Sequence, residues 1–198
     1  MSITSSMVKD LREKTGAGMM DCKEALTKSG GDLEKAIDHL RKKGMSAATK
    51  RSSKAAKDGA IASYIHMGGK IGVLVELNCE TDFVAKTDDF RLLAKELSMH
   101  IAAANPRYLK SEDIPLDLLE REKEIYRSQA LAEKKPEKIW DKIIEGKLKK
   151  YYEDVCLLDQ KFIKDTAITV GTLVSNMIAK TGENIVIRRF TRFQLGAD

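Results

Sequence analysis

The sequence has few of the residues that mark membrane, disordered or disulfide-rich proteins. It contains 3 prolines, 3 cysteines and 1 tryptophan among 198 residues. It also lacks an apolar run of about 18 residues, the length that spans a bilayer. With 42% hydrophobic and 33% charged residues, the composition is that of a soluble globular chain. The first residues lack the apolar stretch of a secretory signal, so we expect a cytoplasmic protein with no membrane partner.

Recognisable catalytic and metal-binding motifs are also missing. Cys22, Cys79 and Cys156 are odd in number and too far apart for metal-ligand spacing, so we expect reduced thiols. The histidines stand apart, and the glycines fit neither the phosphate-loop spacing nor G-x-G-x-x-G. The sequence therefore predicts no catalytic residue, metal site or cofactor. A binding protein is favoured over an enzyme.

Positive charge is concentrated near the start of the chain. Residues 1–57 hold 13 basic and 7 acidic side chains, whereas the whole chain has a net charge of +5. The densest part is residues 41–57, which contain no acidic side chain. Such a run can follow phosphates, so an RNA- or ribosome-associated protein is the alternative function. A solvated linker is favoured, because the run has no aromatic side chain to stack on a base.

Capping signals predict three short helices at the N-terminus. Thr4 can cap the first and Asp32 the third, which we expect to end at Gly44. Helices this short need one another's packing to be stable. Residues 1–45 are therefore predicted to form a three-helix domain, followed by a basic linker at residues 46–59.

Strand patterns begin after this linker. Residues 60–67 and 70–77 are rich in β-formers, and Gly68-Gly69 between them predicts a hairpin with a two-residue turn. Helical spacing and capping signals then predict two further helices and a last strand, at residues 88–104, 169–182 and 185–193.

Residues 116–153 are heavily charged and carry only a thin apolar stripe, which predicts a projecting helical hairpin with a bend or break at Gly146. Strands separated by helices indicate an α+β fold. We therefore predict an α+β core domain at residues 60–198, with an antiparallel sheet and this hairpin.

A first candidate binding segment precedes the second helix, which is predicted to open at Asp21. Met19 and Met20 are adjacent large side chains beside two glycines, and they cannot both face the same small core. Either one is exposed as an adaptable contact for another protein, or both fold back to fill gaps.

A second candidate is Thr81-Asp82-Phe83-Val84, which follows the predicted hairpin. Its spacing favours a turn with Phe83 directed inward. The alternative is a projecting Phe83 that enters an apolar crevice on a partner, with Asp82 redirecting charged groups beside it.

These two segments resemble the bacterial elongation factor Ts family. The similarity is carried by residues 15–23 (TGAGMMDCK) and 78–86 (NCETDFVAK), and it extends over nearly the whole chain. Residues 145–147, 155–158 and 182–190 also match, whereas Lys161 stands where many relatives have a proline.

The resemblance implies a guanine nucleotide exchange factor for the GTPase elongation factor Tu, with a ubiquitin-associated-like N-terminal domain. It implies that residues 81–84 displace magnesium from the GTPase, with Asp82 and Phe83 entering between its helices. This reverses the inward placement of Phe83. It also implies that Met19 and Met20 contact the nucleotide domain of the GTPase.

The resemblance further implies an oligomeric state. Long-form relatives have a core of two related halves, and this chain is shorter. A homodimer that gives a two-to-two assembly with the GTPase is therefore expected. No specific nucleic acid partner is expected.

Overall fold

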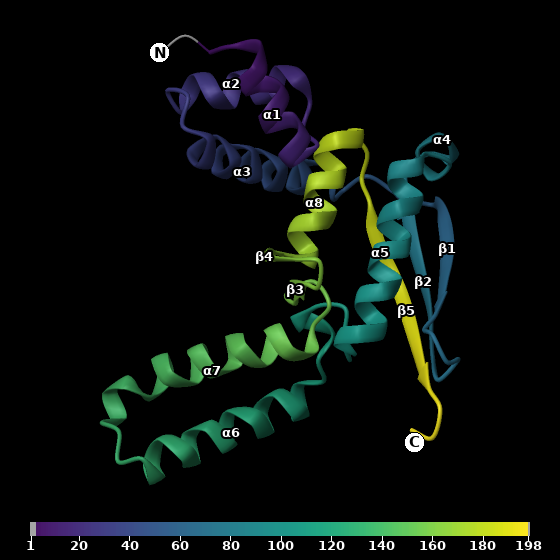
Figure 1. The fold of residues 1–198 in the computed structure, drawn as a ribbon. Coiled ribbons are helices and arrows are strands. Elements are labelled where there is room, and N and C mark those ends of the chain that lie inside the picture. The colour runs from purple at the N-terminus through teal and green to yellow at the C-terminus, as the bar shows by residue number, and fades with distance from the viewer. Residues whose placement is uncertain (1–2, 198) are drawn as a thin grey trace.

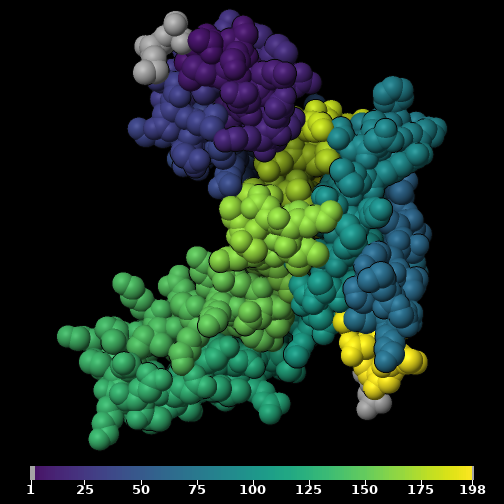
Figure 2. Space-filling model, in the orientation of Figure 1, coloured from purple at the N-terminus to yellow at the C-terminus, as the bar shows by residue number. Residues whose placement is uncertain are grey.

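The computed structural model of the protein describes residues 3–197; residues 1–2 and 198, at the ends of the predicted domains, lie outside the described residues. Three N-terminal helices precede an antiparallel sheet that is packed with further helices, so the α+β fold class is confirmed. The N-terminal helices and a long helical hairpin extend from different ends of the core (Figures 1 and 2).

The α-helices are α1 (Ser5–Thr15), α2 (Met19–Lys28), α3 (Leu33–Arg51), α4 (Asp82–Ala85), α5 (Asp88–Ala104), α6 (Leu116–Ala132), α7 (Trp140–Val155) and α8 (Val170–Thr181). The strands are β1 (Asp58–Ile65), β2 (Ile71–Cys79), β3 (Lys161–Phe162), β4 (Asp165–Thr169) and β5 (Val186–Gln194). Short 3-10 turns lie at Ser111–Asp113 and Glu137–Ile139.

The first and third N-terminal helices begin where their capping residues predict. Thr4 Oγ1 accepts a hydrogen bond from the Met7 amide at 3.3 Å, and Asp32 Oδ1 accepts one from the Lys35 amide at 3.1 Å. The apolar sides of the three helices then meet in a small core of their own. Its buried residues are Val8, Leu11, Cys22, Ala25, Leu26 and Ala36.

The predicted end of α3 at Gly44 is wrong. A glycine ends a helix by adopting a positive φ, which Gly44 does not do. It is instead buried against α8, where Asn176 Oδ1 would lie 3.5 Å from an added Cβ atom. Packing on α8 continues the helix to Arg51, so residues 46–51 of the predicted linker are helical. The predicted domain boundaries at 45 and 59 stay a prediction.

The larger core lies between the sheet and helices α5 and α8. The strands are ordered β1-β2-β5, all antiparallel to their neighbours. One face of β2 presents Val73, Val75 and Leu77, which are buried in a core shared with α5. The buried residues of α5 recur at helical spacing and include Phe90, Leu93, Leu97 and Ile101.

The opposite face of the sheet is uncovered by the described residues. Ile65, Gly72 and Phe193 form one cross-strand row, and Ile61 and Leu74 lie on the same face. Apart from Gly72, all of these are exposed large hydrophobic residues. The open face is thus mixed, because these apolar side chains share it with an ion pair between Glu76 and Arg189 at 2.7 Å.

The turn between β1 and β2 is longer than predicted. Gly68 and Gly69 have positive φ values of 86° and 69°. However, the His66 amide donates to the Ile71 carbonyl at 2.9 Å, so the loop comprises residues 67–70 and the two-residue turn is wrong.

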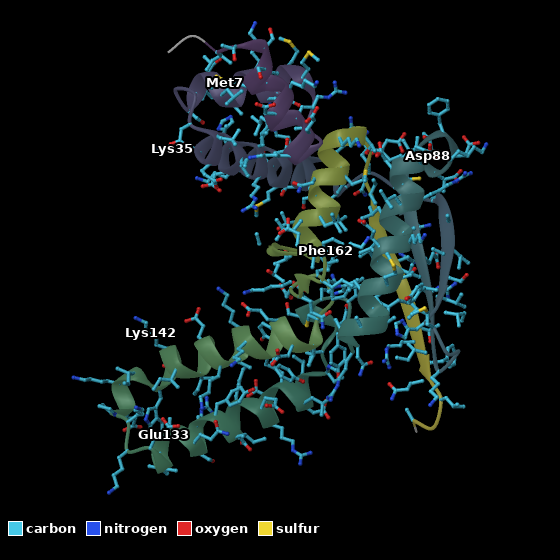
Figure 3. The ribbon with its side chains drawn as sticks, viewed as in Figure 1. Met7, Lys35, Asp88, Glu133, Lys142 and Phe162 are labelled. Carbon is cyan, nitrogen blue, oxygen red and sulfur yellow. The ribbon has the colours of Figure 1, made fainter. Side chains whose placement is uncertain are left out.

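Helices α6 and α7 form the predicted antiparallel hairpin, which projects from the core (Figure 1). The labelled Glu133 and Lys142 lie near its far end (Figure 3). The expected bend or break at Gly146 is wrong, because α7 is continuous from Trp140 to Val155. Ile144 and Leu148, on either side of Gly146, are buried, and their packing keeps the helix continuous through the glycine.

A buried histidine connects the base of this hairpin to α5. His100 Nε2 lies 3.0 Å from Gln160 Oε1, and the Ile163 amide donates to His100 Nδ1 at 3.3 Å. Since Nδ1 accepts, the proton is on Nε2 and the ring is neutral. Burial lowers the pKa of His100 below its ordinary value.

Candidate functional site

The second candidate segment forms a one-turn helix, α4, at the end of β2. Thr81 is its N-cap residue, and its Oγ1 accepts a hydrogen bond from the Val84 amide at 3.4 Å. Val84 and Ala85 are buried in the main core. In Figure 3, Asp88 at the start of α5 lies next to this turn. The segment is thus fixed on one side and free on the other.

Phe83 is on the free side of α4. Its side chain is 80% exposed, so the inward placement that spacing favoured is wrong. An aromatic residue this exposed contributes little to its own core, and it offers a large apolar area to a partner. Phe83 is therefore open to a partner, while its entry between the partner's helices stays a prediction.

Asp82 forms an ion pair within the same turn. Lys86 Nζ lies 2.5 Å from Asp82 Oδ2, and this contact holds the pKa of Asp82 below its ordinary value. Both side chains are mostly exposed. An exposed pair of this kind contributes little stability, so either group can change partners at small cost.

The start of α4 is tied to a turn that is distant in the sequence. The Thr81 amide donates to Glu183 Oε2 at 3.1 Å, and Thr81 Oγ1 donates to Glu183 Oε1 at 2.6 Å. The residues next to these two are also hydrogen-bonded, with donor and acceptor segments exchanged: the Asn184 amide donates to Glu80 Oε1 at 2.7 Å. Sequence reasoning assigned no role to Glu183. The Thr81–Glu183 contacts join residues 102 positions apart, and no local pattern signals such a contact.

The end of α3 joins the same group of contacts. Arg51 lies 3.5 Å from Glu80, and the Asn184 side-chain amide donates to the Lys54 carbonyl at 2.7 Å. The last residues of α3, the start of α4 and the turn after α8 are therefore held together.

The first candidate segment lies in α2. This helix begins at Met19, so its predicted opening at Asp21 is two residues too late. Met19 is 58% exposed and Met20 is 74% exposed, so neither folds back to fill a gap in the core. Two adjacent thioethers in the first turn of a helix give a soft apolar contact surface.

The two candidate segments are separate surfaces. In Figure 1, α2 belongs to the N-terminal helices, whereas α4 lies at the edge of the core beyond α8. Both are at the same end of the molecule, opposite the helical hairpin. A single large partner could therefore contact both surfaces, but a small ligand could not.

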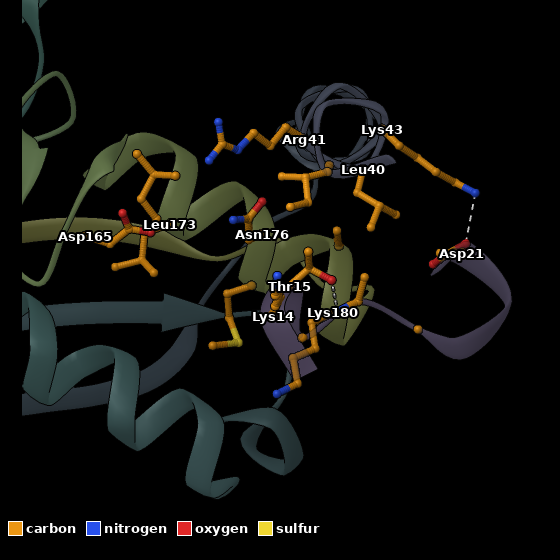
Figure 4. Close-up of a pocket in the computed structure, with 18 residues that line it drawn as sticks. Lys14, Thr15, Asp21, Leu40, Arg41, Lys43, Asp165, Leu173, Asn176 and Lys180 are labelled. Carbon is orange, nitrogen blue, oxygen red and sulfur yellow. Dashed lines mark hydrogen bonds and ion pairs between the residues drawn. The ribbon is translucent and has the colours of Figure 1, made fainter. Parts of the chain in front are cut away.

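A cleft of about 310 Å³ lies between the N-terminal helices and α8 (Figure 4). Leu40 from α3 and Leu173 from α8 line it, and Lys43 pairs with Asp21 at its edge, at 2.9 Å. The lining of this cleft includes neither Met19 and Met20 nor residues 81–84. The cleft therefore lies along the boundary at which the N-terminal helices pack against α8.

Some side chains of the basic run of residues 41–57 form ion pairs within the protein. Lys43 pairs with both Asp21 and Glu24, and Arg51 pairs with Glu80. Hydrogen bonds from Lys28 and Lys43 lower the pKa of Glu24 to about 2. These contacts connect α2 with α3, and α3 with the core.

The cysteines are buried and free. Cys22, Cys79 and Cys156 each have 0% exposure, and burial raises the pKa of each thiol. A disulfide between two copies of the chain would therefore require local opening. Within residues 3–197, no group of three or more His, Cys, Asp or Glu side chains is arranged to hold a metal ion. None of the helices in that range is long and apolar enough to cross a membrane.

Comparisons with known proteins match this chain to one family over nearly its whole length. The family model described as "Elongation factor TS" matches residues 2–197. The chain is 76% identical over 198 residues to elongation factor Ts of Syntrophus aciditrophicus strain SB, covering 100% of this chain and 98% of the relative. It is 57% identical over 196 residues to elongation factor Ts of Geobacter sulfurreducens, covering 99% and 91%. It is 58% identical over 194 residues to that of Caldanaerobacter subterraneus subsp. tengcongensis, covering 98% and 97%. The chain therefore belongs to the elongation factor Ts family, whose members are translation elongation factors.

Proposed function

We propose that this protein is a guanine nucleotide exchange factor that binds elongation factor Tu in its GDP form and accelerates GDP release. Family membership supports the choice of partner. The observation that carries the proposal is the exposure of Phe83 on a helix whose other side is anchored in the core. A side chain held in this way can enter a partner without unfolding its own domain.

The mechanism is a coupling of two binding equilibria. The protein must bind the nucleotide-free GTPase more tightly than the GDP form. By reciprocity, it then weakens GDP binding by the same factor. Phe83 provides this difference if its crevice in the GTPase is open only when the nucleotide site is distorted. No bond is made or broken in this chain, so it acts as a binding protein and not as an enzyme.

Asp82 has a separate role in this proposal. Magnesium is one of the largest local charges in a diphosphate site, so its loss weakens GDP binding. The exposed Asp82 carboxylate can leave Lys86 at small cost and perturb the ion network beside the docked Phe83. Met19 and Met20 then provide a second contact, on the nucleotide domain of the same GTPase.

The direct test is release of a fluorescent GDP analogue from elongation factor Tu. Release is measured after mixing with excess unlabelled GDP, at physiological magnesium, with and without this protein. The rate is expected to rise with the concentration of the protein and then to saturate. The proposal would be refuted if the rate of GDP release stayed unchanged at protein concentrations where complex formation is demonstrated.

We further propose that the protein is a cytoplasmic homodimer joined through the open face of its sheet, giving a two-to-two assembly with the GTPase. The support is the group of exposed apolar side chains on that face, Ile61, Ile65, Leu74 and Phe193, which share it with the Glu76–Arg189 ion pair. Exposed apolar side chains gathered on one face are typical of interfaces. A second copy would bury the same residues from both sides, as two-fold symmetry requires.

Molar mass in solution tests the dimer. The protein is expected to have twice its chain mass of 22.1 kDa by light scattering. Leu74→Asp should give the single-chain mass, because it places a charge at the centre of the interface. A mass of 22.1 kDa for the unmodified protein at micromolar concentration would contradict the proposal.

A further inference from the structure

The helix that carries Phe83 is too short to fix its own orientation. Helix α4 has 4 residues, and helices of a single turn are not stable in isolation. Phe83 adds no packing because it is exposed. The direction in which Phe83 points therefore depends on what holds the two ends of α4.

The C-terminal end of α4 is held by its own neighbours. Val84 and Ala85 are buried, and Thr87 Oγ1 donates to the Val84 carbonyl at 2.7 Å. The N-terminal end is held differently. Thr81 contacts Glu183 through two hydrogen bonds, one from its amide and one from its hydroxyl.

The Glu183 carboxylate also orders the cap of the helix. Because the Thr81 hydroxyl donates its proton to Glu183, its oxygen lone pairs remain available to accept from the Val84 amide. Hydrogen bonds to an ionised carboxylate are stronger than neutral ones. The carboxylate therefore fixes both the position of Thr81 and the direction of its capping oxygen.

The turn that carries Glu183 is itself fixed. Gly182 ends α8 with a φ of 74°, and the next residues enter β5. Asn184 is 4% exposed and bonds to Glu80 and to the Lys54 carbonyl. The half-buried Glu183 therefore lies between a helix end of defined geometry and a buried, hydrogen-bonded residue.

We propose that Glu183 is a positioning residue for nucleotide exchange: its carboxylate clamps Thr81 and so holds α4 in the orientation from which Phe83 enters the GTPase. This inference rests on the proposed function of Phe83. Glu183 acts through Phe83 and does not itself touch the nucleotide. Its removal should leave the fold intact and reduce the rate of GDP release.

The first test is hydrogen exchange in the protein by itself. Glu183→Ala should increase amide exchange in residues 81–87, and Glu183→Gln should have a smaller effect because one oxygen acceptor remains. Glu96→Ala is the matched control. It removes a carboxylate that contacts Lys164 at 3.1 Å, and it should leave residues 81–87 unchanged. Unchanged exchange in Glu183→Ala would overturn the clamp.

The second test is a double-mutant cycle on catalysed GDP release. Loss of two hydrogen bonds to a carboxylate should slow release about tenfold in Glu183→Ala. In the Phe83→Ala background, Glu183→Ala should cause little further slowing, because the side chain that it positions is absent. A merely structural role would slow release by the same factor in both backgrounds, and that result would overturn the proposal.

One further variant completes the design. Thr81→Val removes both the hydroxyl that donates to Glu183 and the oxygen that caps α4, so it should increase amide exchange in residues 81–87 more than Glu183→Gln does. If wild type and Phe83→Ala release GDP at different rates but Glu183→Ala matches wild type, only the positioning role fails. If wild type does not accelerate release at all, the proposed function fails first, and the role of Glu183 in exchange fails with it.

Discussion

Replacement of Phe83 by alanine should separate binding from folding. The side chain is 80% exposed, so the substitution should change the free energy of unfolding by no more than about 0.5 kcal/mol. On docking, the same phenyl group would be buried in the partner. Full burial of a Phe side chain contributes about 1.5–3 kcal/mol, which corresponds to a loss of roughly 10- to 150-fold in the rate of catalysed release.

The assay is stopped-flow release of a fluorescent GDP analogue at subsaturating concentrations of the protein. Phe83→Leu should be intermediate, because it keeps an apolar side chain of smaller area. Leu116→Ala is the matched control, since Leu116 is 78% exposed at the start of α6 and lies in neither candidate segment. It should behave as wild type.

Magnesium provides a mechanistic check on the same variant. If Phe83 and Asp82 act by weakening the hold of magnesium on GDP, the defect of Phe83→Ala should shrink when magnesium is chelated. A release rate for Phe83→Ala equal to wild type, with the same affinity for the GTPase, would refute the reasoning. So would a free energy of unfolding that falls by several kcal/mol, because Phe83 would then be a structural residue.

Three further predictions concern other parts of the molecule. Met20→Ser should weaken complex formation about tenfold without changing stability, measured by calorimetry, because it removes an exposed apolar contact. Gly59→Ala should lower stability by about 2–5 kcal/mol in urea unfolding, because the added Cβ would lie 2.1 Å from the Leu77 carbonyl oxygen at a φ of +141°. Since the folded pKa of His100 lies below 6.5, its stabilising effect is present above pH 6.5 and is lost as the pH falls towards the folded pKa, by up to about 1.4 kcal/mol per pH unit. His66→Gln should keep this acid sensitivity and His100→Gln should lose it.

Local chemistry predicted the elements whose ends are set by a single side chain. Helix α5 spans residues 88–104, as its apolar spacing predicts, and Thr169 caps α8 as expected. The antiparallel strands also follow from alternation along the chain. In these places the nearest neighbours in sequence are the residues that decide the structure.

Predictions failed where a distant surface decides the outcome. Gly44 reads as a helix stop, but contact with α8 continues the helix through it. Spacing placed Phe83 inward, but Val84 and Ala85 fill the core beneath α4 and leave Phe83 exposed. Gly146 reads as a break, but packing between α6 and α7 keeps the helix continuous.

The sequence by itself determined the class of the fold, the capped helices and the two segments on which the family resemblance rests. Those properties depend on residue type and short spacing, which a linear pattern carries. Only the tertiary structure decided that Met19, Met20 and Phe83 all face outward, and that Glu183 reaches Thr81 across 102 positions. The reason is physical: exposure and long-range hydrogen bonds depend on which surfaces meet after the chain folds, and no local pattern specifies that meeting.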